Sequence, residues 1–498
     1  MIRATSSHVF ALLLLFSGLA AGAFGPSSAT AEDAVLPSGA SPAISEREPE
    51  KLGPPPICDQ GDRLKAASEA LELARGPKTQ DSMIKWLRSY PFRPRLEASG
   101  SGVSLIWTPD RGSRLQESGG NVVWLREWDS VSGWTVPAAV SEGGQSQRYH
   151  PALLIARDGA AYAAWLEPEV QVQTGGSDAR IVGSVRTKGV WSRAIRLSDQ
   201  PGKPLRLSGY RTDLVEDGEG KVHVFWTDSR EEHFEWSLAH PGPEAYTKIS
   251  RKVFGAPAET PAEQVSERGA FSVEELDLAA VGNPSNTTLD VLFGVRGRRA
   301  SVDERDLFIV RNSGKGWGRP VRLLSGKNRE PRLADVSRVS AERNSEGDLV
   351  VVYGGVPAEG TPADDFGSQV RLLLVEVSGG TKMTLLSRGW NGSRLEMAAG
   401  PNEGVFVAFQ SARHKWNSKA QAWLGSGEEE AETLYVMLTE GGRCVDSAIV
   451  AETSVLGSFD IAADSNGRIH AVWVEGDGEE AVLKHRWFVT TRSSASGG

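Results

Sequence analysis

Several basic side chains each stand a few residues ahead of an apolar segment that ends in an aromatic residue: Arg93, His150, Arg211, Arg338 and Arg394. Guanidinium groups bind carboxylates through two parallel hydrogen bonds, so three arginines around one space would form an anion site. Carboxylates and a phenol occur at comparable places: Tyr149, Asp213, Glu274, Glu275, Asp277 and Asp460. Two carboxyl groups are also what glycoside hydrolysis requires. The candidate binding residues are therefore Arg93, His150, Arg211, Glu274, Arg338, Arg394 and Asp460, and no catalytic residue stands out.

Other types of chemistry have no matching pattern in the sequence. The chain contains no His-Glu-x-x-His, no Gly-x-Ser-x-Gly and no phosphate-binding glycine loop. His223 and His470 each stand three residues before a tryptophan, which indicates a structural role that is repeated along the chain. Asp158-Gly159, Asp217-Gly218 and the segment 464–467 are typical of hairpin turns rather than of calcium loops. We therefore expect no metal ion and no cofactor.

The candidate residues belong to a sequence repeat that occurs seven times between residues 90 and 490. Each copy contains an apolar strand, a turn rich in Gly or Asp, and an alternating strand that ends in an aromatic residue: Trp107, Trp165, Trp226, Phe293, Tyr353, Phe409 and Trp473. Further short strands follow in each copy, and four strands per repeat are typical of a β-propeller blade. We predict an all-β fold, a seven-bladed β-propeller over residues 90–490, with six blades and a divergent end copy as the alternative.

The two ends of the chain differ from the repeats. Residues 1–31 combine Arg3, a short apolar run and small residues up to Ala31, which predicts a signal peptide cleaved before Glu32. Residues 32–57 are rich in Pro, Ser, Ala and Glu and predict a disordered linker. Within residues 58–89, helical spacing predicts a short helix over about 62–75, and the segment 82–90 would supply a strand that closes the ring. Residues 491–498 are expected to be a flexible tail.

Only two cysteines occur, Cys58 and Cys444. In an exported protein they can form a disulfide, which would tie the N-terminal arm near the point where the ring closes. Two separate thiols are the alternative.

The phrases "VHVFWTDSR" and "GVWSRAIRLSD" resemble the sialidase-like (BNR-repeat) β-propeller superfamily over about residues 90–490. The Asp-box turns of that superfamily, Ser-x-Asp-x-Gly-x-x-Trp, are eroded here, since Asp129 is kept before Trp134 but Asn312 replaces the aspartate before Trp317. Residues 90–94, "YPFRP", partly match the Phe/Tyr-Arg-Ile-Pro motif of catalytic sialidases and lack its isoleucine. The resemblance implies that a catalytic member would clamp a carboxylate with Arg93, Arg211 and Arg394, and would add a Tyr–Glu nucleophile and an acidic Asp.

Two hypotheses for function follow. The arginines stand at different offsets within the repeat and no Tyr–Glu pair is marked by its spacing, so we favour a binding or scaffold propeller that recognises a glycan or an extracellular protein without catalysis. The alternative is an exo-sialidase-type glycoside hydrolase. The net charge of -9 and the pI of about 5.6 argue against nucleic acid and anionic membranes as partners. No later segment is apolar over enough residues for membrane insertion, so we expect a monomer that is secreted or periplasmic.

Overall fold

The computed structural model describes most of residues 63–491, and all of these belong to one unit of the chain, Glu48–Gly498. The predicted signal peptide and linker, nearly all of the predicted tail, and the candidates Arg93, Arg211 and Glu274 lie outside the described residues. In the described part of the chain, no helix is long and apolar enough to cross a membrane. The described ranges are 63–75, 94–108, 122–142, 148–170, 178–198, 212–228, 248–257, 259–265, 278–296, 305–324, 333–357, 368–377, 380–400, 404–412, 415–417, 422–424, 432–453, 456–476 and 481–491.

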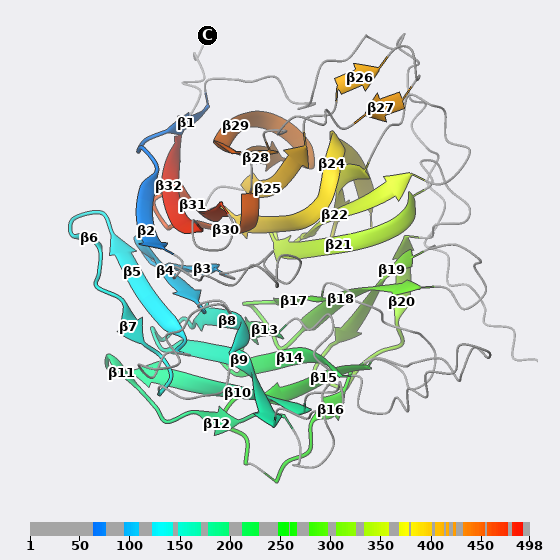
Figure 1. Cartoon of the computed structure of the whole chain (residues 1–498). Helices are drawn as coiled ribbons and strands as arrows, with labels where there is room; N and C mark the ends of the chain where they lie inside the picture. Colours follow the sequence, from blue (N-terminus) through cyan, green and yellow to red (C-terminus); the bar gives the residue numbers. More distant parts are fainter. Residues whose placement is uncertain are drawn as a thin grey trace, which may run out of the picture. The chain divides into compact units, whose positions relative to one another are not determined.

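The strands form consecutive antiparallel blades, each with the first strand of its copy innermost (Figure 1). Blade 1 comprises β3 (Arg95–Ser99), β4 (Gly102–Trp107), β5 (Trp124–Asp129) and two short outer strands, β6 (Gly133–Trp134) and β7 (Ala138–Ala139). Blade 2 comprises β8 (Tyr149–Ile155), β9 (Ala161–Val170), β10 (Asp178–Thr187), β11 (Val190–Trp191) and β12 (Ile195–Arg196). Blade 3 comprises β13 (Thr212–Glu216), β14 (Val222–Asp228), β15 (Lys248–Val253) and β16 (Glu263–Gln264). Blade 4 comprises β17 (Leu278–Gly282), β18 (Leu289–Arg296), β19 (Arg305–Asn312) and β20 (Val321–Leu324).

Blades 5 and 6 share one long strand, β24 (Thr381–Ala399), whose first part is the outer strand of blade 5 and whose last part is the inner strand of blade 6. Blade 5 also contains β21 (Leu333–Arg343), β22 (Leu349–Pro357) and β23 (Ser368–Val375). Blade 6 also contains β25 (Gly404–Ala412), β28 (Glu432–Glu440) and β29 (Arg443–Thr453), and a separate hairpin of β26 (Lys415–Asn417) and β27 (Ala422–Leu424) follows β25. Blade 7 contains β30 (Leu456–Ala463), β31 (Arg468–Glu475) and β32 (Val482–Thr490).

The core consists of seven apolar clusters, and each cluster is shared by two neighbouring blades. One of them joins blade 7 to blade 1, so the interfaces form a closed cycle. The repeated aromatic residue on each second strand is buried, in no case more than 4% exposed, and in all blades but the first the strand continues beyond it. Closure buries both faces of every blade, which a single four-stranded sheet cannot do. The prediction of seven blades is confirmed, and the six-bladed alternative is wrong.

The prediction of a helix over residues 62–75 is wrong. These residues form two strands, β1 (Leu64–Ala66) and β2 (Leu71–Arg75), which pair antiparallel with β32 and complete blade 7. Without them the outer edge of β32 would leave backbone N–H and C=O groups unpaired. Leu64 and Leu73 also enter the apolar clusters on the two faces of blade 7, and this burial outweighs the helical spacing of the apolar residues. The segment 82–90, predicted to close the ring, lies outside the described residues, and 64–75 provide the pairing instead.

The repeated histidine has the structural role that the sequence indicates. Asp217, in the turn between the first two strands of blade 3, accepts hydrogen bonds from two backbone N–H groups through Oδ1, and its Oδ2 lies 2.8 Å from His223 Nε2. Asp464 accepts two backbone N–H groups in the same way in blade 7, with its Oδ2 3.6 Å from His470 Nε2. Each histidine thus faces the aspartate that shapes its own hairpin turn.

The turn before Trp134 keeps the structural function of an Asp-box, since Asp129 Oδ1 accepts the backbone N–H groups of Val131 and Ser132. Cys444, at the start of β29, is disulfide-bonded. The other cysteine, Cys58, lies outside the described residues, and the pairing of the two stays a prediction.

Candidate functional site in the central channel

The first strand of every blade contributes one side chain at an equivalent position, paired with the residue just before the buried aromatic on the second strand. We call these seven residues the first level: Arg95, Ala152, Asp213, Ala279, Ser340, Glu396 and Asp460. We call the residues two positions after these on each first strand the second level. It includes two more carboxyl groups, Glu97 and Glu342. At these two levels, charged side chains therefore come from blades 1, 3, 5, 6 and 7, whereas blades 2 and 4 contribute only apolar residues.

Arg95 connects blades that are not neighbours in the ring. Its Nη1 lies 3.1 Å from Glu396 Oε2 of blade 6 and 3.8 Å from Asp460 Oδ2 of blade 7. Because blade 7 separates blades 1 and 6, this contact lies in the innermost space of the ring. The Glu396 and Asp460 side chains are only 4% and 8% exposed. The sequence identified Asp460 but missed Arg95 and Glu396, because only the ring closure brings these three residues together.

The electrostatic environment of this space favours neutral carboxyl groups. Burial, and after it the charges of Asp213 and Asp460, raises the pKa of Glu342 to about 8. Burial also raises the pKa of Glu97 well above its usual value, with further contributions from Glu342, Asp460 and Asp213. Both side chains keep part of their surface exposed. A protonated carboxyl group both donates and accepts a hydrogen bond, so the second level of the channel presents neutral polar groups near pH 7.

Two first-level aspartates join neighbouring blades through backbone hydrogen bonds. Asp213 Oδ2 accepts the N–H of Ala280 in blade 4 at 2.9 Å, and Asp460 Oδ2 accepts the N–H of Leu96 in blade 1 at 2.8 Å. In each case Oδ1 accepts the N–H of the next residue on the same strand. Burial and the nearby Glu396 raise the pKa of Asp460. Asp460, a predicted binding residue, is therefore already engaged in joining two blades.

The basic candidates stand two residues before the first-level residue of the same strand. His150, Arg338 and Arg394 each precede the first-level residue of their strand by two positions, at Ala152, Ser340 and Glu396. The expectation that the basic residues stand at different offsets is therefore wrong for these three, which share one blade position. His150 has a left-handed backbone, with φ of 51°, where the pairing of β8 with β9 is irregular. Arg93 and Arg211 lie outside the described residues, and in the sequence they precede Arg95 and Asp213 by the same two positions.

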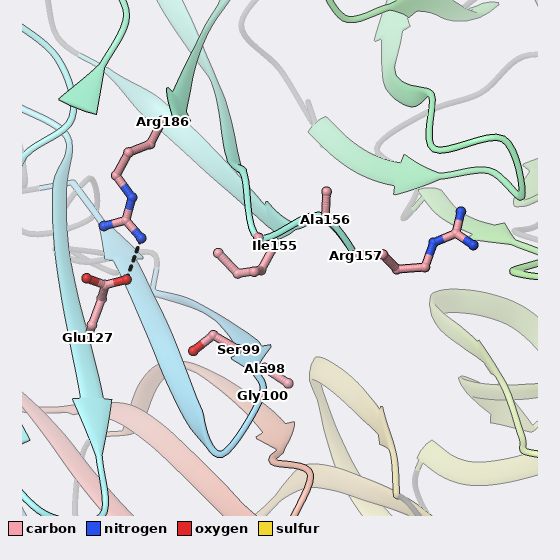
Figure 2. Close-up of a pocket in the computed structure, with 9 residues that line it drawn as sticks. Ala98, Ser99, Gly100, Glu127, Ile155, Ala156, Arg157 and Arg186 are labelled. Carbon is pink, nitrogen blue, oxygen red and sulfur yellow. Dashed lines mark hydrogen bonds and ion pairs between the residues drawn. The ribbon is translucent and has the colours of Figure 1, made fainter. Parts of the chain in front are cut away.

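A separate hollow of about 540 Å³ lies between blades 1 and 2, beside the hairpins at Gly100 and Gly159 (Figure 2). On one wall Arg186 Nη2 lies 2.5 Å from Glu127 Oε1. Figure 2 shows Arg157 directed away from this pair, and its guanidinium binds Glu216 and two backbone carbonyl oxygens of blades 3 and 4. These charged groups are already paired and hold the blades together, so we locate the candidate site in the channel rather than in this hollow.

Within the described ranges, no group of His, Cys, Asp and Glu side chains could hold a metal ion. No protein-family model and no curated protein sequence matches this chain.

Solved structures do match the chain. A protein of unknown function from Dyadobacter fermentans DSM 18053 is 12% identical, covering 86% of this chain and 100% of that one, with a TM-score of 0.45. A PL25 ulvan lyase is 10% identical over 81% and 94% of the two chains, with a TM-score of 0.49. The Hadza microbial sialidase Hz136 is 11% identical over 80% and 66%, with a TM-score of 0.42. At these values the similarity is one of architecture and says nothing about ligand or activity. The chain's own strand pairing and its closed cycle of blade interfaces show that it is a seven-bladed β-propeller.

Proposed function

We propose that this chain is a glycan-binding propeller whose ligand carries an acidic group held at the basic end of the channel. The observation that carries the proposal is the shared blade position of His150, Arg338 and Arg394, two residues before the first level. In the sequence, Arg93 and Arg211 also stand two residues before the first-level residues of their copies. Guanidinium groups from several blades, if they converge from this shared position, would suit bidentate binding of a carboxylate or sulfate group. The choice of a glycan rests on the resemblance of the strand phrases to the sialidase-like superfamily.

Binding is favoured over hydrolysis by the state of the carboxylates and tyrosines in the described residues. Asp213 and Asp460 accept backbone hydrogen bonds, and Glu396 contacts Arg95, so these three acids are committed to holding the ring. Among the described tyrosines, Tyr162, Tyr353 and Tyr435 pack against Phe254, Met383 and Phe409, respectively. Tyr149, next to His150 in the chain, packs against the apolar cluster between blades 2 and 3. A sialidase-type nucleophile would need this tyrosine to be paired with a glutamate.

The test is calorimetric titration of the chain 32–498 with oligouronates, sulfated oligosaccharides and neutral oligosaccharides of equal length. We expect an acidic ligand to bind, with an affinity that falls as salt is added. The double variant Arg338→Met/Arg394→Met should lose at least about tenfold in affinity, by analogy with truncated charge pairs. Arg193→Met, on an exposed outer turn of blade 2, is the control for loss of one cation and should bind normally. Equal binding of neutral ligands, unaffected by the double variant, would refute the proposal.

The alternative activity is tested on the same protein. A fluorogenic sialoside should not be hydrolysed above background by the unaltered chain. Turnover that disappears in both Arg211→Ala and Tyr149→Phe would replace the binding proposal with a sialidase-type hydrolase.

We also propose that the chain is exported and acts as a monomer outside the cytoplasm, because of the signal-like pattern in residues 1–31. N-terminal sequencing of the protein recovered from an expressing bacterium should begin at Glu32. An N-terminus that retains Arg3 would contradict this expectation.

A further inference from the structure

Four buried or half-buried side chains form a line of polar contacts across the interface between the last blade and the first. Trp134 of β6 donates its indole N–H to His485 Nδ1 at 3.1 Å. His485 Nε2 lies 3.1 Å from His470 Nδ1, and His470 Nε2 faces Asp464 Oδ2 at 3.6 Å. His470 and His485 are 0% and 2% exposed. We call these four residues the seam relay.

Chemistry fixes the direction of the two hydrogen bonds in the seam relay, Trp134–His485 and His485–His470. An indole nitrogen only donates, so His485 Nδ1 must be an acceptor and carries no proton. The proton of neutral His485 is then on Nε2, which donates to His470 Nδ1. His470 consequently carries its proton on Nε2, directed at the carboxylate of Asp464. The relay is complete only while both imidazoles are neutral.

A proton added to either imidazole breaks the line. On His485 it would place an N–H opposite the indole N–H of Trp134, and on His470 it would place an N–H opposite that of His485. The charged groups around the pair are Asp464 and Arg468 in blade 7 and Arg126 of β5. Glu72 of β2 is exposed and stands opposite Lys484, not His485, in the strand register. Among the residues that the structure describes, Asp464 is the acid that faces the relay, and Arg468 Nε already lies 3.0 Å from its Oδ2. Little negative charge is therefore left to stabilise an imidazolium.

The seam relay lies where the ring depends on the ends of the chain. Blade 7 is completed by β1 and β2 from the N-terminal side, and the relay joins its β31 and β32 to the outer strand of blade 1. The Trp128 ring of blade 1 packs edge-on against His470, with the ring centres 4.5 Å apart. Loss of the relay would thus weaken the one interface that connects the last blade to the first.

We propose that the seam relay is a pH-sensitive clasp, which holds blade 7 against blade 1 when its histidines are neutral and loosens this interface when they are protonated. His223 of blade 3 provides an internal comparison. It has the same repeat position as His470, but Arg251 Nε donates to its Nδ1 from the same blade, at 2.9 Å. Protonation of His223 would therefore disturb its own blade and leave the interface between blades intact.

Burial lowers the pKa of both relay histidines, of His485 most strongly. A histidine whose pKa is lowered on folding stabilises the folded state above its unfolded pKa of 6.5, and this stability is lost as the pH falls below that value. For His485 alone, lowering the pH from 7.5 to 5.0 would raise the opening equilibrium by up to about 30-fold.

The experiment is hydrogen exchange followed by mass spectrometry on the full chain at pH 7.5 and pH 5.0, corrected for the intrinsic pH dependence of exchange. We expect protection of peptides covering 64–75 and 482–490 to fall by about tenfold or more at pH 5.0. Peptides covering 278–296 of blade 4, which contain no histidine, should change much less. An equal loss in both regions, or no loss at pH 5.0, would refute the clasp.

Two variants separate the relay from a general effect of acid. Glutamine at position 485 can accept from the indole and donate to His470 without titrating, so His485→Gln should keep the seam protected at pH 5.0. Trp134→Phe removes the donor that forbids a proton on His485 Nδ1, so its seam should be weaker at pH 7.5 and less sensitive to acid. A full acid response in whichever of these variants folds would contradict the proposal.

Discussion

Replacing Glu342 with glutamine should stabilise the propeller at neutral pH and have almost no effect in acid. Glu342 lies on β21 in the second level of the channel, and its pKa is about 8 in the folded protein against 4.5 for an ordinary glutamate. Between these two values the folded state binds more protons than the unfolded state, so stability falls as the pH rises. Glutamine has nearly the same shape and never ionises, so this loss disappears.

The magnitude follows from the gap between the two pKa values. Each pH unit above 4.5 costs the wild-type protein about 1.4 kcal/mol, which gives about 3 kcal/mol at pH 7 and a ceiling of about 5 kcal/mol above pH 8. The side chain keeps part of its surface exposed, and screening by solvent reduces the effect. We therefore expect Glu342→Gln to raise the free energy of unfolding by about 1–2 kcal/mol at pH 7.

The assay is urea denaturation followed by tryptophan fluorescence at pH 4.5, 6, 7.5 and 9. Glu346→Gln is the matched control, because Glu346 is exposed on the hairpin of the same blade. The difference between Glu342→Gln and wild type should be near zero at pH 4.5 and should grow with pH, whereas the control difference should stay flat. A difference that is constant with pH, or destabilisation by glutamine at pH 7.5, would refute the reasoning that burial keeps Glu342 protonated.

Three further substitutions test the architecture. Leu64→Ala should lower the free energy of unfolding by about 2–5 kcal/mol, measured by thermal or urea unfolding, because Leu64 is buried against blade 6. Leu71→Ala, on the exposed side of β2, should lower it far less. Equal effects would contradict the assignment of β1 as a core strand. Trp226→Ala should cost about 3–5 kcal/mol, since it empties the interface between blades 2 and 3, and a loss below about 1 kcal/mol would argue against ring packing. Asp213→Ala should cost about 1–3 kcal/mol at pH 7 because the N–H of Ala280 loses its acceptor, and Asp213→Asn should recover part of this loss if one oxygen suffices.

The candidate site was only partly predictable. The basic residues at positions 150, 338 and 394 were identified from their place ahead of apolar strands, yet their common blade position was missed. The signal was in the spacing, because each of the three stands fifteen residues before the aromatic residue of its own copy. The strand pairing shows that this spacing is one blade position. Glu97 and Glu342 gave no signal, because a glutamate in a short strand is ordinarily on a solvated face. The ring of blades turns that face toward the channel.

The sequence by itself determined the number and kind of units. Seven buried aromatics at the ends of alternating strands are a local pattern, because each residue packs against the blade next to its own, and a repeat leaves the same pattern in every copy. The tertiary structure decided how the ends of the chain are used. The apolar residues of segment 64–75 have helical spacing, but the segment pairs as two strands with the edge of β32. Only this pairing gives it both backbone hydrogen bonds and burial on the two faces of blade 7. The tertiary structure also decided the chemistry of the channel, because Arg95, Glu396 and Asp460 are far apart in the chain and meet only when the ring closes.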